Sequence, residues 1–252
     1  MKKITLLAVA VMMAICSFAQ EKLMKVYKGN SVVAQEFVNN IDSIVFVDFE
    51  VDPSLLYVED VFTISGRGTV VTGVVIKGGF KKGQTVGVVT INEAASVVTS
   101  ATIAGLEMFK KEVEEVVEGD NVGILFGTDI DKTAFPRGTA IIAAGNSPYI
   151  PATKITGDMY VLTKEEGGRP NPFSLGYSPQ LYIGTTDVTV KCTNLGTVDG
   201  ATVEMVVPGS NTVGTEWVLN SEGYRIIGYV GQKVAIREGG RTVAEMTITK
   251  LE

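Results

Sequence analysis

The chain has 252 residues, 45% of them hydrophobic and 20% charged, so its composition is that of a folded protein with room for two domains and a terminal segment. Its net charge of −6 disfavours binding to phosphate backbones. The sequence contains no histidine, which excludes histidine-based acid–base or nucleophilic catalysis and histidine metal ligation.

Residues 1–19 have the pattern of a secretory signal peptide. Lys2 and Lys3 precede an apolar run at 4–15, and the small-x-small triplet Ser-Phe-Ala follows at 17–19. This order predicts cleavage before Gln20 and export to the periplasm, the cell surface or the exterior. The apolar run is shorter than the roughly 20 residues that span a bilayer, so no transmembrane span is expected after signal removal.

The two cysteines bear on processing and on redox chemistry. Cys16 would be the acylated first residue of a lipoprotein, but the bulky Ile15 before it disfavours that processing. Removal of residues 1–19 takes away two lysines and no acid, and so changes the net charge from −6 to −8. It also leaves Cys192 as the only cysteine, so no intramolecular disulfide can form and the core must hold the fold.

Residues 20–54 form a predicted N-terminal extension. Strand-like sequence at 24–27 and 31–37 is separated by a Gly-Asn turn signal, and a further apolar stretch follows at 41–46. The pattern predicts a β-hairpin or a pair of short strands ahead of the larger domains.

From residue 55 onward, alternating runs rich in Val, Thr and Ile are separated by glycine turns, which is typical of many short antiparallel strands. We therefore predict an all-β fold of two consecutive antiparallel β-barrels, at 55–147 and 148–252. Only 107–117 favours a helical turn, because Lys and Glu residues fall there at helical spacing. The predicted strands lie at 61–65, 69–76, 84–92, 97–104, 121–126, 139–144, 153–162, 180–186, 188–193, 202–206, 224–229, 234–237 and 242–250.

The sequence at 58–73, Val-Glu-Asp-Val-Phe-Thr-Ile-Ser-Gly-Arg-Gly-Thr-Val-Val-Thr-Gly, resembles the opening of the second domain of elongation factor Tu. Residues 105–109 and 120–125 resemble later strands of that domain. The resemblance covers about residues 55–251 and implies two antiparallel barrels packed side by side, in agreement with the strand pattern. Segments that resemble the third domain lie at 165–169, 172–173, 176–177, 179–180, 185–189, 205–209 and 235–243.

The resemblance does not extend to nucleotide binding. In the family, GTP is bound by a preceding domain with a phosphate-binding Walker loop, whereas only residues 1–54 precede the first predicted barrel here. The nearest match to that loop, at 78–83, is followed by Gln-Thr where Lys-Ser/Thr is required. The Gly-Arg-Gly at 66–68 has Val71 where a dinucleotide fingerprint needs its third glycine. We therefore expect no GTP binding, no cofactor, no metal site and no enzyme activity.

The resemblance implies one candidate ligand site. In the family, the second domain holds the aminoacyl end of transfer RNA, where carboxylates and an amide can hydrogen-bond an ammonium or ribose hydroxyl and a phenylalanine supplies an apolar face. The alternative is that these residues have structural roles only. The phenylalanine and the threonine would then pack in the barrel, the two adjacent acids would cap the entrance to a strand, and the asparagine would fix a turn. The matching residues are Glu59, Asp60, Phe62, Thr72, Glu107 and Asn121.

Several departures argue against nucleic acid as the partner. At positions where the family carries Lys or Arg, this sequence has uncharged residues, and each lost phosphate contact weakens polyanion binding. Of the arginines that remain, three lie in Gly-Arg turns, where an ion pair or a carbonyl contact is a sufficient reason for them. The uncharged residues are Val74, Val117, Gly127, Ala144, Leu175, Ser178 and Gly184, and the remaining arginines are Arg67, Arg169, Arg237 and Arg241.

These observations predict a non-catalytic, exported binding protein whose partner is a protein or small ligand of the envelope or exterior. The alternative is a translation factor-like protein that binds aminoacyl-tRNA or another nucleotide-bearing ligand through the same pocket. An enzyme that uses Glu59 and Asp60 as acid and base is disfavoured, because neighbouring strand residues point to opposite faces. Trp217 is expected in the core or at an edge, and Cys192 is expected to be a half-buried, inert thiol.

Overall fold

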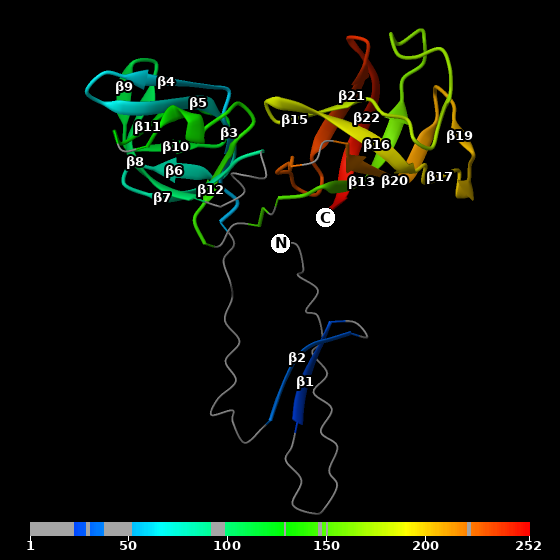
Figure 1. Ribbon diagram of the computed structural model, residues 1–252, viewed down its shortest axis with the longest axis horizontal. Helices are drawn as coiled ribbons and strands as arrows, with labels where there is room; N and C mark the ends of the chain where they lie inside the picture. The colour runs from blue at the N-terminus through cyan, green and yellow to red at the C-terminus, as the bar shows by residue number, and fades with distance from the viewer. Residues whose placement is uncertain are drawn as a thin grey trace, which may run out of the picture. The chain divides into compact units, whose positions relative to one another are not determined.

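A computed structural model describes residues 23–28, 31–37, 52–91, 99–128, 130–145, 148–149, 151–220 and 223–252 (Figure 1). The predicted signal peptide at 1–19 and the apolar stretch at 41–46 lie outside these residues. The described elements are β-strands and one turn of 3-10 helix, η3 (Lys132–Ala134). The chain divides into two compact units, 1–49 and 50–252, which are described separately.

The first unit contains a β-hairpin. Strands β1 (Leu23–Lys28) and β2 (Ser31–Phe37) pair antiparallel, with Leu23 opposite Phe37 and Lys28 opposite Ser31. The register shifts between Val26 and Tyr27, as at a β-bulge. The hairpin predicted for the N-terminal extension is therefore confirmed.

The second unit begins with a closed antiparallel barrel, barrel 1. Six of its strands form a ring in the order β11, β5, β3, β12, β7 and β8, and the ring closes because β11 pairs with both β5 and β8. Strand β4 pairs with the first half of β5, β9 extends β8, and β6 pairs with β10. The bounds are β3 (Leu55–Tyr57), β4 (Asp60–Ile64), β5 (Gly68–Lys77), β6 (Gly79–Lys81), β7 (Thr85–Val89), β8 (Thr99–Met108), β9 (Lys111–Val113), β10 (Glu115–Val117), β11 (Asn121–Phe126) and β12 (Ala140–Ala143).

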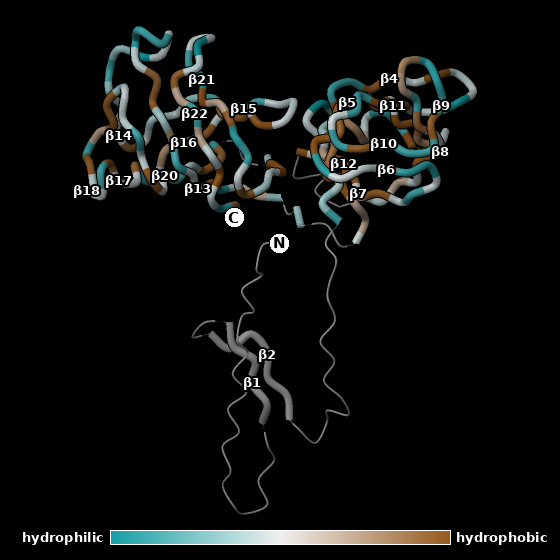
Figure 2. The backbone as a smooth tube through the Cα atoms, turned by 180° about the vertical axis from the view of Figure 1, so that it is seen from behind, coloured by the Kyte–Doolittle hydropathy of each residue, from teal (hydrophilic) through white to brown (hydrophobic). Residues whose placement is uncertain are grey.

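Alternation along these strands builds the core of barrel 1. In β11, for example, Val122, Ile124 and Phe126 are buried while the residues between them face outward. The Phe126 ring stacks on Phe135, at a centroid distance of 4.7 Å. Figure 2 shows hydrophobic positions interspersed with hydrophilic ones along the strands of both barrels. Alternation therefore produces the hydrophobic interior that the sequence predicted.

The helical turn predicted at 107–117 is wrong. This stretch comprises the end of β8, then β9 and β10. Two of its glutamates form ion pairs with lysines at and just after the end of β6 instead of along a helix, with Lys81–Glu115 at 3.3 Å and Lys82–Glu114 at 3.6 Å. Glu115 lies opposite Lys81 in the pairing of β10 with β6, and Val116 is buried against the core.

Barrel 2 follows with the same architecture. Its ring runs β13, β22, β21, β15, β16 and β20, and it closes because β13 pairs with both β22 and β20. Two small hairpin-like pairs, β14–β19 and β17–β18, lie outside the ring. The bounds are β13 (Lys154–Val161), β14 (Phe173–Ser174), β15 (Gln180–Ile183), β16 (Thr186–Asn194), β17 (Thr197–Val198), β18 (Ala201–Thr202), β19 (Met205–Val206), β20 (Asn211–Leu219), β21 (Lys233–Glu238) and β22 (Arg241–Leu251).

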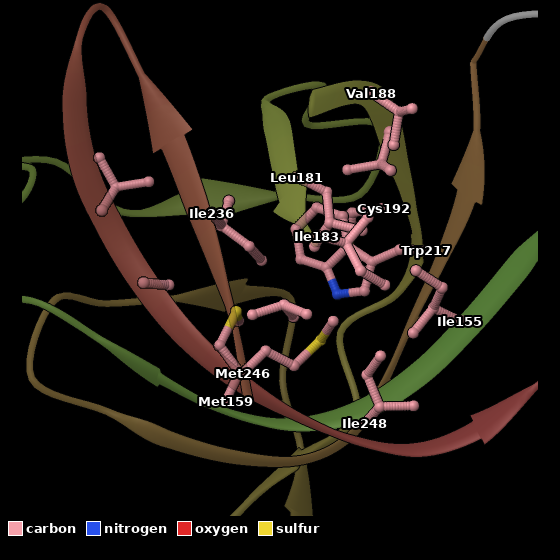
Figure 3. Close-up of a cluster of buried hydrophobic side chains, with 14 of the residues drawn as sticks. Ile155, Met159, Leu181, Ile183, Val188, Cys192, Trp217, Ile236, Met246 and Ile248 are labelled. Carbon is pink, nitrogen blue, oxygen red and sulfur yellow. The ribbon is translucent and has the colours of Figure 1, made fainter. Parts of the chain in front are cut away.

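Trp217 forms the centre of the barrel 2 core. Its side chain is 0% exposed, and Figure 3 shows its ring beside Leu181, Ile183 and Cys192 in the interior. Cys192 is buried and unpaired, and burial raises the pKa of its thiol to about 11, so the thiolate required of a nucleophile is disfavoured. The core position predicted for Trp217 is confirmed, and Cys192 is buried more completely than predicted.

The strand predicted at 224–229 is also wrong. No strand forms there: Tyr224 and Ile226 make isolated β-bridges, that of Ile226 with Ala152. The segment is apolar because Ile227 and Tyr229 pack into a third hydrophobic cluster with residues of barrel 1, including Leu55 and Tyr57. Ile227 and Tyr229 thus pack between the barrels without joining a sheet, whereas Ile226 packs in the core of barrel 2.

Hydrogen bonds add to the apolar contacts between the barrels. The Tyr57 hydroxyl donates to the Ile227 carbonyl oxygen at 2.9 Å, and the Thr185 hydroxyl donates to the Val58 carbonyl oxygen at 2.6 Å. Gly184, which lies at φ +56°, packs against the face of the Tyr57 ring, where a Cβ atom would come within 2.7 Å of the ring carbons. The two barrels thus share one interface built around a buried tyrosine.

Candidate functional site

A cavity of about 430 Å³ lies on the outer surface of barrel 1. Its walls come from three adjacent strands, β5, β11 and β8, whose alternate residues face outward while the intervening ones fill the core. Strand β4 borders it on the β5 side, and the turn between β8 and β9 borders it on the β8 side. The cavity therefore belongs to one barrel and is built on paired strands.

Four of the six predicted site residues line this cavity. Phe62 comes from β4, Thr72 from β5, Glu107 from β8 and Asn121 from the start of β11. The strand register brings them together, because Gly123 lies opposite Thr72 on one side and Glu107 on the other. Residues that are up to 59 positions apart in the sequence thus converge on one site.

The predicted acids Glu59 and Asp60 do not line the cavity. The Glu59 backbone N–H donates to the Thr72 carbonyl oxygen at 2.8 Å, and its own carbonyl oxygen accepts from Arg137 at 3.1 Å. The Asp60 carboxylate accepts a hydrogen bond from the Val61 N–H at 2.8 Å. The structural interpretation of these two residues, as the entrance to a strand, is the one that the structure supports.

Two glycines shape the cavity. Gly105 and Gly123 line it from the middle strands, and their backbones are outside the positive-φ region that would demand glycine. A Cβ atom would meet Leu125 at 3.6 Å at position 105 and Val70 at 3.6 Å at position 123, which is ordinary van der Waals contact. The backbone at both positions would therefore accept a larger residue. With glycine there, the space that a side chain would fill belongs to the cavity.

The apolar part of the site is unusually accessible. The Phe62 side chain is 42% exposed and that of Phe109, in the β8–β9 turn, is 88% exposed, and both line the cavity. Ile64, Val70 and Leu125 add aliphatic surface between them. Exposed aromatic surface around a concave site is a feature of ligand-binding pockets.

Hydrogen-bonding groups in the site are free for a ligand. Within the described part of the chain, the side chains of Thr72 and Asn121 form no hydrogen bond with another residue. A hydroxyl and an amide can each donate and accept, so the pair can recognise either kind of polar group. The turn role predicted for Asn121 belongs to its neighbour Asp120, whose carboxylate accepts from the Val117 N–H at 2.8 Å.

Charged residues surround the rim. Arg67 lies 3.8 Å from the Glu107 carboxylate and 3.5 Å from that of Glu112, so it is shared by two acids. Lys110 also lines the cavity and has no ion-pair partner among the described residues. Glu107 is half-exposed, so its pairing with Arg67 leaves its carboxylate accessible to a ligand donor.

Sequence reasoning missed five lining residues that matter to the shape. They follow from strand period two, because each lies two residues from a predicted one on the same face of its strand. On this basis Ile64 can be inferred from its position two residues from Phe62. In the same way, Val70 can be inferred from Thr72, Gly105 from Glu107 and Gly123 from Asn121. Phe109 also follows two residues after Glu107, although it lies in a turn.

The side chains of Arg67, Arg169 and Arg237 make the ion pairs or carbonyl contacts that the sequence predicted. Arg67 pairs with acids, and the Arg237 guanidinium donates to the Gly240 carbonyl oxygen at 2.7 Å. Arg169 donates to the Asn171 carbonyl oxygen at 2.7 Å and lies over the Tyr177 ring at 4.4 Å. Among the described residues, no group of acids and cysteine could hold a metal ion. In the same part of the chain, no helix is long and apolar enough to cross a membrane.

Fold and site together define a tandem β-barrel protein with a ligand-sized cavity in its first barrel. Comparison with models of known protein families shows which domains these barrels are related to. Residues 68–138 match elongation factor Tu domain 2, and residues 148–252 match the elongation factor Tu C-terminal domain. The chain thus carries two domains of the elongation factor Tu type, and the matches do not include the nucleotide-binding domain of that family. The sequence resemblance is confirmed for both barrels.

Proposed function

We propose that this chain is an exported, non-catalytic binding protein that holds a small ligand, or an exposed group of a partner, in the cavity of barrel 1. The observation that carries the proposal is the convergence of Phe62, Thr72, Glu107 and Asn121 on one open cavity whose floor is kept clear by glycine. A merely structural role for these residues would not require open space beside them.

The size and chemistry of the cavity support this proposal. Ligand pockets measure roughly 300–1,000 Å³ and combine apolar walls with a few placed polar groups. Here Phe62, Val70 and Leu125 supply apolar contact, Thr72 and Asn121 supply donors and acceptors, and the Glu107 carboxylate accepts from an amine or hydroxyl. The ligand that fits is a compact molecule with an apolar group and a hydrogen-bonding end.

The pattern of residues 1–19 supports an extracytoplasmic site of action. The absence of histidine and the separation of Glu59 and Asp60 from the cavity support binding without catalysis.

Filling the cavity tests the proposal. The chain from Gln20 onward is titrated with Nile red, an uncharged aromatic dye whose fluorescence rises in apolar surroundings. Gly105→Val places a branched side chain in the cavity at a position where the backbone accepts it, so affinity should fall by about tenfold or more. Thr102→Val adds the same residue at an exposed position of the same strand, outside the cavity, and should bind as the wild type does. Equal affinity in Gly105→Val and the wild type would contradict the proposal.

A second candidate is recognition of aminoacyl-tRNA or another nucleotide-bearing ligand. The observation that favours it is that the cavity holds four of the residues that the elongation factor Tu resemblance assigns to the aminoacyl end. The uncharged residues at positions 74, 117, 175 and 184 count against it, since phosphate contacts supply most of such affinity. We expect no gel shift with aminoacyl-tRNA at low salt, and a shift that Gly105→Val abolishes would establish this candidate instead.

A further inference from the structure

The turn between β8 and β9 uses residues that its geometry disfavours. Met108 lies opposite Lys111, so the loop has two residues, Phe109 and Lys110. Their φ angles are +49° and +65°. Positive φ at both positions defines a type I′ turn, which strongly favours Asn, Asp and Gly because a bulky side chain is strained in the left-handed region.

The same chain forms this turn elsewhere with the favoured residues. Between Val198 and Ala201, the loop is Asp199-Gly200, with φ angles of +51° and +81°. Between β21 and β22, the loop is Gly239-Gly240, with φ angles of +56° and +80°. Phe and Lys in barrel 1 are therefore not imposed by the hairpin geometry, which glycine and aspartate satisfy at lower strain.

Packing does not explain Phe109 either. A strained aromatic residue can be offset by burial of its ring, but this ring is 88% exposed and makes no ring contact with another described aromatic residue. It does line the cavity, on the flank opposite to β4, which carries the exposed Phe62. Strained backbone that the fold does not require is concentrated at functional sites, where it fixes a side chain in position.

We propose that Phe109 is a specificity-determining residue of the cavity, held at its rim by the strained turn so that it and Phe62 contact the apolar group of the ligand from two sides. This inference rests on the proposed binding function and adds the class of ligand. The ligand must carry an apolar ring or branched chain large enough to reach both rims. Lys110, the other residue of the turn with positive φ, also lines the cavity.

The test copies the chain's own Asp-Gly turn into barrel 1. The double variant Phe109→Asp with Lys110→Gly relieves strain at both positions and removes the ring. Its melting temperature should rise by about 3 °C, because only an exposed side chain is lost and the new residues suit the turn. Its affinity for Nile red should fall by about tenfold, because one of the two aromatic contacts is gone.

A single variant separates the two effects. Lys110→Gly relieves strain but keeps Phe109, so this variant should be more stable than the wild type and should bind the dye more tightly than the double variant does. Phe109→Leu keeps apolar contact and should lie between the wild type and the double variant in affinity.

The outcomes distinguish this inference from the proposed function. If the wild type binds and Gly105→Val does not, but the double variant binds as tightly as the wild type, Phe109 is not a contact and the inference is overturned while the cavity function stands. A double variant that is less stable than the wild type shows that the turn was not strained, which also overturns it. If Gly105→Val binds as the wild type does, both the function and the inference fail.

Discussion

Tyr57 is buried in the interface between the two barrels, and its environment predicts how the stability of the fold depends on pH. Burial raises the pKa of its hydroxyl above the ordinary value of 10.0, and burial likewise raises the pKa of Tyr149, in the same cluster, to about 12. The folded chain therefore holds these protons more tightly than the unfolded chain. The resulting stabilisation is complete below pH 10 and is lost as the pH rises through the folded-state values.

Tyr57→Phe should reveal this dependence. Near neutral pH the variant should be less stable by about 1 kcal/mol, because the Ile227 carbonyl oxygen loses its buried donor. Above pH 10 the wild type alone loses stabilisation from this group, by about 1.4 kcal/mol per pH unit, so the difference between the two proteins should shrink. Urea denaturation between about pH 8 and pH 11 measures it. A difference that stays constant over this range would contradict the assignment.

At the same scale, the sequence predicted the polar and apolar identities of the site better than its shape. Phe62, Thr72, Glu107 and Asn121 were assigned through the resemblance to elongation factor Tu, and all four line the cavity. Gly105 and Gly123 were not, because a glycine that leaves space looks the same in a sequence as a glycine that makes a turn. Strand period two places each glycine on the same face as a predicted residue, and the strand register then shows that both lie in one cavity.

Among the elements, strands with uninterrupted alternation were predictable and interrupted ones were not. The prediction for 121–126 coincides with β11, which alternates without a break. Strand β20 was missed because Gly214 interrupts its run: this residue lies at φ +72°, where the register with β13 shifts, and its N–H donates to the Asp158 carboxylate at 2.9 Å. A bulge glycine in a strand resembles a turn glycine when only the sequence is known.

Glycines with positive φ can have different structural demands, and a pair of substitutions should show this. Gly184 lies at φ +56°, and a Cβ atom added there would come within 2.7 Å of the Tyr57 ring, whereas Gly214 lies at φ +72° and a Cβ atom there would meet nothing within 4 Å. Gly214→Ala should cost only the conformational strain, about 1 kcal/mol. Gly184→Ala should cost about 3 kcal/mol, because it adds a collision with a ring that cannot move without opening the interface.

Urea denaturation of both variants measures this difference. Equal losses of stability would mean that the ring moves freely and that the barrels are not fixed to each other through Tyr57. The larger loss in Gly184→Ala would show that no side chain fits against the ring at this position.

For the whole molecule, the alternating pattern and the resemblance were sufficient to predict two barrels, but not how they are joined. The apolar run at 224–229 was predicted as a strand because burial between domains and burial in a sheet select the same residues. Interface residues such as Tyr57 and Thr185 carry no local signal, since their partners are more than 100 positions away in the sequence. Tertiary contacts of this kind are visible only in the structure.

The proposed function belongs to the whole molecule: two barrels of the translation-factor type present an open, glycine-floored cavity for a ligand outside the cytoplasm. Its most direct test is amide chemical-shift mapping by NMR on the chain from Gln20 onward, titrated with Nile red. The largest shifts should cluster at the cavity, in Phe62, Thr72, Gly105, Glu107 and Gly123, and should vanish in Gly105→Val. Shifts that cluster on barrel 2, or that persist unchanged in Gly105→Val, would contradict the proposed function.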